Sequence, residues 1–172
     1  MSILWSQQKP NVKVYAFEAS SYIFKILKKN VLINSCNVEP INALVGNKNK
    51  ENQLIRKSSL KEYRTYGTNK IEEVQGSNSE NVDKINAINI DDFKFEKKIS
   101  AMKIDVQGYD LDALKGAEKT ILKHRMPIIF EYEDKFADEF NYTFKDYEEF
   151  INKINYKIES KVDEINYLIL PK

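Results

Sequence analysis

Three acidic residues that end short apolar runs are the first candidates for chemistry in this chain. They are Glu18, Asp105 and Glu131. In an open parallel sheet, ligands bind outside the carboxyl ends of the strands, so these three positions predict a site. A carboxylate placed there can accept hydrogen bonds from ribose hydroxyls, orient a substrate hydroxyl or act as a general base.

The runs that carry these acids have the composition of buried strands, because β-branched and aromatic residues dominate them. A fourth run of the same kind contains Pro40, which has no backbone donor and therefore predicts a bulge or an irregular start. Two final runs flank Asp163 and Glu164 and predict an antiparallel hairpin with a tight turn. The six strands are expected over residues 12–17, 37–45, 99–105, 128–132, 156–162 and 165–170.

Apolar residues at helical spacing follow three of these strands. Ser20 or Ser21 is the expected cap of the first helix, and Thr143 with Asp146 forms the expected cap and first turn of the third. The helices themselves are expected from the serine cap to near Asn34, from about Asp110 to Leu122, and from Thr143 to about Ile154.

Strands that alternate with helices predict an α/β fold with a mostly parallel sheet, helices on both faces and a C-terminal antiparallel hairpin. With 172 residues, one domain over residues 1–172 is expected. Residues 46–89 are polar and predict an insertion with one short strand and a mobile loop around residues 76–81.

The composition excludes several classes of protein. The 27 Lys and Arg residues balance 26 Asp and Glu residues, so no basic surface for nucleic acid or an anionic membrane is expected. Cys36 is the only cysteine, so an intrachain disulfide cannot form, which fits a reducing, cytoplasmic compartment. We find no apolar run long enough for an export signal or a membrane span.

One segment carries a specific family pattern. Residues 103–108 read KIDVQG, and Asp110 and the LKGA of residues 114–117 follow in register. Together with VYAFE at residues 14–18, they make the chain resemble the FkbM family of methyltransferases from about Ser2 onwards. The chain differs from that family at Gln107, Asp110 and Ala19, where the family has an acid, a glutamate and often a proline.

The resemblance implies a Rossmann-like methyltransferase fold that transfers a methyl group from S-adenosylmethionine to a hydroxyl of a sugar or small metabolite. It implies cofactor contacts from Glu18, Ala19, Ala43 and Leu44, and catalytic roles for Asp105 and Glu131. No metal is expected. The chain has no G-x-G-x-x-G pattern, so the first strand and its glycine loop are expected to be missing.

Other interpretations stay open. The chain is alternatively an inactive fragment or a binding module derived from such a domain, and exposed sheet edges predict self-association. Asp105 also has the residue type of a helix cap, and with Glu131 and Glu133 it has the ligand type for Mg²⁺, although carboxylates at strand ends are common without metal. A nucleic-acid methyltransferase is disfavoured because no DPPY-like tetrapeptide follows Asp105.

Three residues are expected to be structural. His124 stands near the end of a predicted helix, where a cation complements the helix dipole. Gly108 is expected to form a turn, and Gly116 is expected to allow a close contact of its helix.

Overall fold

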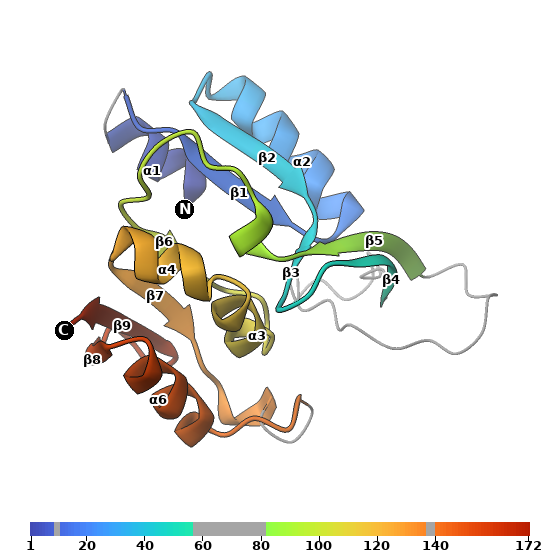
Figure 1. Ribbon diagram of the computed structural model, residues 1–172. Helices are drawn as coiled ribbons and strands as arrows, with labels where there is room; N and C mark the ends of the chain where they lie inside the picture. The colour runs from blue at the N-terminus through green and yellow to red at the C-terminus, as the bar shows by residue number, and fades with distance from the viewer. Residues whose placement is uncertain (9–10, 57–81, 137–139) are drawn as a thin grey trace. The chain divides into compact units, whose positions relative to one another are not determined.

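A computed structural model of the chain describes residues 1–8, 11–56, 82–136 and 140–172. Strands and helices alternate along most of it and an antiparallel hairpin closes the chain, so the predicted α/β fold and its C-terminal hairpin are confirmed (Figure 1). The chain divides into two compact units. Unit 1 comprises Met1–Leu44 and Lys50–Ala87, and unit 2 comprises Val45–Asn49 and Ile88–Lys172. The expectation of one domain over residues 1–172 stays a prediction.

Unit 1 holds the N-terminal strands and helices. Its β1 and β2 form a two-stranded parallel sheet, and a second sheet has the order β3-β5-β4. The element β3 (Leu44–Val45) and the end of β5 fall at the boundary of the unit. The other bounds are α1 (Ser2–Gln8), β1 (Val14–Glu18), α2 (Ser21–Ile33), β2 (Val38–Asn42), β4 (Lys50–Arg56) and β5 (Val82–Ile88).

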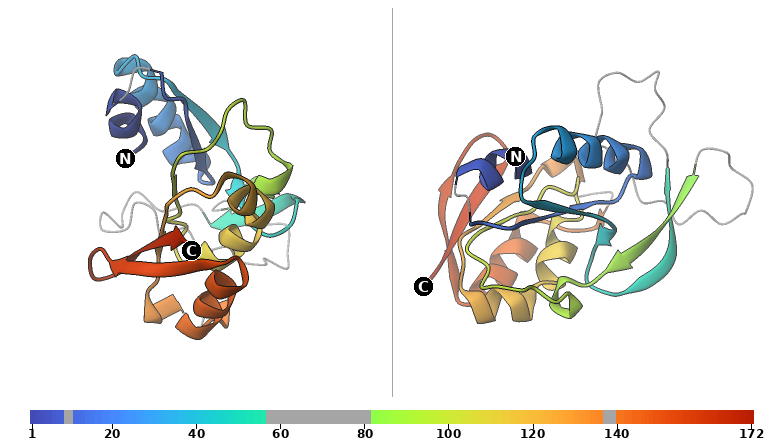
Figure 2. Two further views of the ribbon diagram at one scale, coloured as in Figure 1. Left: turned by 60° about the vertical axis from the view of Figure 1, so that its left-hand side comes forward. Right: turned by 90° about the horizontal axis from the view of Figure 1, so that it is seen from above.

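Unit 2 holds a four-stranded sheet with the order β6-β7-β9-β8. The pair β6·β7 is parallel, whereas β7·β9 and β8·β9 are antiparallel. The hairpin of β8 and β9 is drawn in red in Figure 2, next to α6. The bounds are η1 (Ile90–Asp92), β6 (Met102–Lys103), α3 (Asp110–Lys115), α4 (Glu118–His124), β7 (Ile128–Glu131), η2 (Asp134–Phe136), α6 (Phe144–Lys153), β8 (Tyr156–Lys161) and β9 (Asn166–Pro171).

The helix α2 begins and ends where its capping residues predict. The Ser20 hydroxyl accepts a hydrogen bond from the Ile23 amide at 3.4 Å, and Asn34 forms the C-cap. No residue of α2 is fully buried. Its half-buried apolar side, with Leu27 and Val31, packs on the small core of β1 and β2, as the helical spacing predicts.

The predicted strand over residues 37–45 is in fact two strands. The expected bulge at Pro40 is wrong, because the parallel register runs without interruption from Val14 opposite Val38 to Glu18 opposite Asn42. Within the described residues, β1 is the one strand that pairs with β2. The other edge of β2 therefore has no strand partner, and the missing backbone N–H of Pro40 can be tolerated there. The break comes at Ala43, whose amide donates to the Glu18 carbonyl at 3.2 Å before β3 joins the other sheet.

The polar segment over residues 46–89 contains more strand than the one short strand expected. Its β4 and β5 pair antiparallel, from Lys50 opposite Ala87 to Arg56 opposite Val82. Ile85 and Ala87 of β5 are buried against Leu44, so a few alternate apolar positions are enough to anchor the ribbon. The expected mobile loop around residues 76–81 lies outside the described residues.

The predicted helix from Asp110 to Leu122 is interrupted. It forms α3 and α4, with Gly116 and Ala117 between them. The Gly116 carbonyl accepts the Asp91 amide at 2.9 Å, and the Asp91 carboxylate in turn accepts the amides of Lys119 (2.9 Å) and Thr120 (2.7 Å). A side chain from another segment therefore caps a new helix where the spacing of apolar residues predicts a continuous one.

Unit 2 has the larger core. The helix α6 begins with the expected capping box, because Asp146 accepts the Thr143 amide at 2.7 Å, and its apolar face is buried as predicted. In the described part of the chain, no helix has the length and apolar character that crossing a membrane requires. The fully buried apolar side chains of the unit include Leu111, Leu114, Ile121, Ile128, Phe130, Ile154, Tyr156 and Ile169.

Candidate active site

Asp105 and Glu131 lie next to each other in unit 2. The parallel register of β6 and β7 places Lys103 opposite Ile129, and the Ile104 amide continues it by donating to the Ile129 carbonyl at 2.8 Å. Two residues beyond the Lys103 and Ile129 pair on each chain segment, the carboxyl groups of Asp105 and Glu131 form a hydrogen bond. The structure thus brings the two predicted catalytic residues together at the carboxyl ends of two parallel strands.

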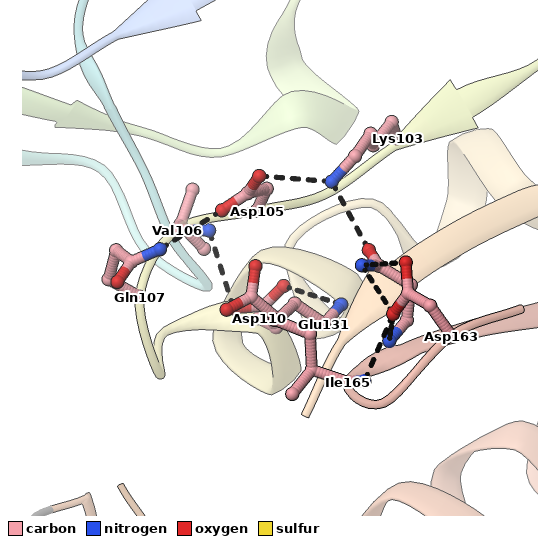
Figure 3. A network of polar contacts seen from close by, with 9 residues as sticks. Lys103, Asp105, Val106, Gln107, Asp110, Glu131, Asp163 and Ile165 are labelled. Carbon is pink, nitrogen blue, oxygen red and sulfur yellow. Dashed lines mark hydrogen bonds and ion pairs between the residues drawn. The ribbon is translucent and has the colours of Figure 1, made fainter. Parts of the chain in front are cut away.

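Asp105 is the accessible member of this pair, with 46% of its side chain exposed. Lys103 Nζ lies 3.0 Å from one carboxylate oxygen, and Gln107 Nε2 donates to the other at 3.1 Å (Figure 3). Partial burial raises the pKa of Asp105, but the hydrogen bonds from Glu131, Lys103 and Gln107 outweigh it and hold the pKa below its usual value. Asp105 is therefore an anion at neutral pH.

Glu131 is the buried member, with 6% of its surface exposed. Burial, followed by the hydrogen bond and the charge of Asp105, raises the pKa of Glu131 to about 8. At neutral pH Glu131 therefore carries the proton and donates it toward the Asp105 carboxylate. Because the groups are coupled, a titration of this site reports the pair as a whole.

Sequence analysis missed three residues as members of this site. Lys103 and Gln107 contact Asp105 directly, and the Asp110 carboxylate accepts the backbone amides of Val106 and Glu131 (Figure 3). Gln107 occupies the position where the family pattern has an acid, and its backbone is left-handed with φ 53°. All three fall in the KIDVQG segment or just after it, so the motif itself was the signal that could have identified them.

A small pocket adjoins Glu131. It encloses about 10 Å³, room for about one water molecule. Gly108, which forms the predicted turn with φ 93°, lies at one side of it. Burial and the nearby Asp112 raise the pKa of Tyr142 to about 12, so this phenol stays protonated. The pocket is lined by Gly108, Glu131, Tyr132, Glu133, Phe140, Tyr142 and Tyr147.

The predicted cofactor residues gather in unit 1, where β1 and β2 end. One Glu18 carboxylate oxygen accepts the Ser20 amide at 2.7 Å. The Asn42 amide group donates to the carbonyls of Glu18 (2.8 Å) and Ala19 (3.2 Å), and Ala19 packs on the buried Leu44. Ala43 completes the group, because its backbone amide donates to the Glu18 carbonyl. Asn42 was not predicted, although its place at the end of a strand was a signal.

Glu133 belongs to the surroundings of the site, because its side chain hydrogen-bonds to Glu131 and lines the pocket, and it also pairs with Lys135 at 2.6 Å. His124 is structural as expected, but by another mechanism: its Nδ1 accepts the Ile99 amide at 3.2 Å, which requires the neutral ring. Burial and two nearby lysines lower the pKa of His124 accordingly. Among the described residues, no three His, Cys, Asp or Glu side chains are grouped to hold a metal ion.

The family model described as the methyltransferase FkbM domain matches residues 4–158. The chain belongs to the FkbM methyltransferase family. A solved relative, the crystal structure of methyltransferase FkbM from Methylobacillus flagellatus KT, is 16% identical with a TM-score of 0.56. The match covers 91% of this chain and 36% of that one, so the FkbM chain described here spans little more than a third of the length of that relative. No curated protein matches the sequence.

Proposed function

We propose that this FkbM-family chain takes part in S-adenosylmethionine-dependent methyl transfer to a hydroxyl of a saccharide or a small metabolite. The observation that carries the proposal is the pair of carboxyl groups at Asp105 and Glu131, one ionised and exposed, the other protonated and buried. Such a pair at the carboxyl ends of parallel strands is suited to receive one proton from a hydroxyl.

The chemistry asks little of the protein beyond alignment and removal of a proton. S-adenosylmethionine, when bound, supplies the reactive methyl group. Asp105 accepts the proton of the acceptor hydroxyl at its exposed carboxylate. Glu131 orients Asp105 through their hydrogen bond, and Lys103 stabilises its charge until the proton arrives. Alignment of reacting groups supplies a large part of such rate enhancements, so few catalytic residues are needed.

The residues of unit 1 fit the cofactor's ribose. Glu18 is the last residue of β1 in the parallel pair with β2, and an acid at such a strand end is suited to accept hydrogen bonds from ribose hydroxyls. Ala19 is partly buried and offers apolar surface beside it, whereas Ala43 and Leu44 are buried, and Leu44 packs against Ala19. Asn42 holds the backbone of Glu18 and Ala19 in place through its two hydrogen bonds.

A second candidate function, a binding module without catalysis, is favoured by one observation. The pocket next to Glu131 has room for about one water molecule, far less than a sugar ring needs. For catalysis, the acceptor must therefore reach Asp105 from its exposed side or widen this pocket.

Calorimetric titration with S-adenosylhomocysteine tests the cofactor site. We expect Glu18→Ala to weaken binding by about 10-fold to 100-fold, because a hydrogen bond to a charged group is lost. Glu39→Ala is the matched control: it removes another carboxylate of unit 1, which pairs with Lys13 at 2.8 Å, and should leave binding unchanged.

Transfer of a labelled methyl group from S-adenosylmethionine to a panel of methyl glycosides and small alcohols then separates the two candidates. Transfer that is lost in Asp105→Asn supports the enzyme. Cofactor binding without transfer to any member of the panel favours the binding module, and absence of cofactor binding by the wild-type chain contradicts the proposal.

A further inference from the structure

Asp110 is a buried carboxyl group whose hydrogen bonds join two separate segments of unit 2. It is fully buried, with 0% exposure. One of its oxygens accepts the Glu131 amide at 3.1 Å, and the other accepts the Val106 amide at 3.4 Å (Figure 3). A further hydrogen bond comes from the Gly108 backbone. A single side chain thus connects the last residue of β7 to the loop that follows β6.

These two segments carry the proposed proton acceptor and its partner. Val106 directly follows Asp105, and the amide bound by Asp110 belongs to Glu131 itself. The sheet alone does not hold the pair, because β6 contains only Met102 and Lys103 and the described register with β7 ends before Asp105. Beyond that point, the Ile104 amide donates to the Ile129 carbonyl, and the Asp110 carboxylate accepts one backbone amide from each of the two segments.

We propose that Asp110 is the positioning residue of the Asp105 and Glu131 pair, holding the two carboxyl groups within hydrogen-bond reach by accepting one backbone amide from each side. Because Asp110 is fully buried, it offers no exposed surface to an acceptor or a cofactor. Its part in catalysis rests on the function proposed above, whereas its control of the pair is a property of the structure that can be measured without activity.

An ordinary role as a helix-capping acid does not account for this arrangement. Asp110 is the first residue of α3, where an acid favours the helix dipole from an exposed position. Here the carboxylate is buried and accepts a strand amide outside the helix. Burial of a carboxylate costs desolvation free energy, which an exposed capping acid would avoid. Burial raises the pKa of Asp110 to about 6 in spite of its hydrogen bonds.

The charged and titratable groups around Asp110 come from three elements. Asp105 faces it from the loop after β6, and its charge raises the pKa of Asp110 further. Glu131 faces it from β7, and the charge of Asp110 contributes to the raised pKa of that carboxyl. Tyr147 faces it from α6, and after burial the charge of Asp110 raises the pKa of that phenol. Loss of the Asp110 charge should therefore act on Glu131 directly.

NMR titration of the wild-type chain is the first test, because it needs no variant that folds. The amide signals of Val106 and Glu131 should both move with a common midpoint of about 6 as Asp110 gains a proton. If these two amides stay still through this range, the proposal is overturned. The result does not depend on whether the chain transfers a methyl group.

The second test follows the ¹³C signal of the Glu131 carboxyl in Asp110→Asn. The pKa of Glu131 should fall by about one unit, because a nearby negative charge is removed and the pair separates. Asp91→Asn is the matched control: Asp91 also binds two main-chain amides in unit 2, at 2.9 and 2.7 Å, but it serves α4 and should leave the Glu131 titration unchanged.

An unchanged Glu131 titration in a folded Asp110→Asn chain, or an equal shift in Asp91→Asn, would overturn the positioning role. Where an acceptor has been found, methyl transfer by Asp110→Asn should fall about 100-fold, the cost typical of a small misplacement of reacting groups. If both titrations give the expected result and no acceptor is found, the proposed function fails and the positioning of the pair stands.

Discussion

Substitution of Gly116 by alanine is expected to destabilise the chain strongly, for a reason that lies in one backbone contact. A Cβ atom at Gly116 would lie 2.0 Å from the carbonyl oxygen of Gly46 and 2.8 Å from its carbonyl carbon. Both are backbone atoms, so no flexible side chain can move aside. The φ of Gly116 is −72°, which any residue adopts, so the steric contact alone explains the need for glycine.

The magnitude follows from what must move. To reach an ordinary contact distance above about 3 Å, the two segments must separate by at least about 1 Å. That movement strains the hydrogen bond from the Gly46 amide to the Ile88 carbonyl (3.0 Å) and the one from the Asp91 amide to the Gly116 carbonyl (2.9 Å). Overpacking usually costs about 1–3 kcal/mol. We expect about 3 kcal/mol here because both sides are backbone.

Thermal unfolding followed by circular dichroism measures the effect. For a chain of this length, about 3 kcal/mol corresponds to a fall in Tm of about 6–12 °C. Gly46→Ala is the matched control, since a Cβ at Gly46 meets nothing within 4 Å, and it should be neutral or slightly stabilising. A Gly116→Ala chain that unfolds within 2 °C of wild type, or an equal loss in Gly46→Ala, would refute the reasoning.

Three further predictions concern the site and the core. Asp105→Asn should reduce methyl transfer by about 100-fold to 10,000-fold with unchanged binding of S-adenosylhomocysteine by calorimetry, because a general base is lost but the cofactor residues are not. Because the pKa of Glu131 is raised in the folded chain, its contribution to stability is complete below its ordinary pKa of 4.5 and is lost as the pH rises through about 8. The free energy of unfolding in urea should therefore fall between these two pH values, and the fall should be smaller in Glu131→Gln. Arg125→Lys should lower the free energy of unfolding in urea by about 2 kcal/mol. The Arg125 guanidinium donates to the carbonyls of Ile154, Asn155 and Lys172 at 3.0 to 3.2 Å, and an ammonium group cannot reach all three.

The elements that were predicted well are those whose signals lie within a few residues of one another. Ser20 before a helical pattern, Thr143 three residues before Asp146, and Asp163 between two apolar runs each specify a local hydrogen bond. The structure forms all three: Ser20 accepts the Ile23 amide, Asp146 accepts the Thr143 amide, and Asp163 accepts the amides of Ile165 and Asn166 at 3.0 and 2.9 Å.

The elements that were mispredicted depend on distant partners. A continuous helix from Asp110 to Leu122 satisfies every local rule, and it is broken because Asp91 caps its second half and Gly46 lies against Gly116. Likewise, β5 is held by burial against Leu44, which its polar neighbours in the sequence do not indicate. Apolar spacing reports which face of an element is buried, but not which side chain from elsewhere ends it.

The candidate site shows the same division between local and distant signals. Parallel strands that end in acids predicted that Asp105 and Glu131 would lie close together, because strand pairing is general to the fold class. The sequence could not assign their different protonation states, since these come from unequal burial: one carboxyl is accessible and contacts Lys103, and the other is enclosed. Asp110 went unrecognised for a related reason. An acid in the first turn of a helix has a sufficient local explanation, and only its contact with the Glu131 amide in three dimensions shows that it joins the two strand ends.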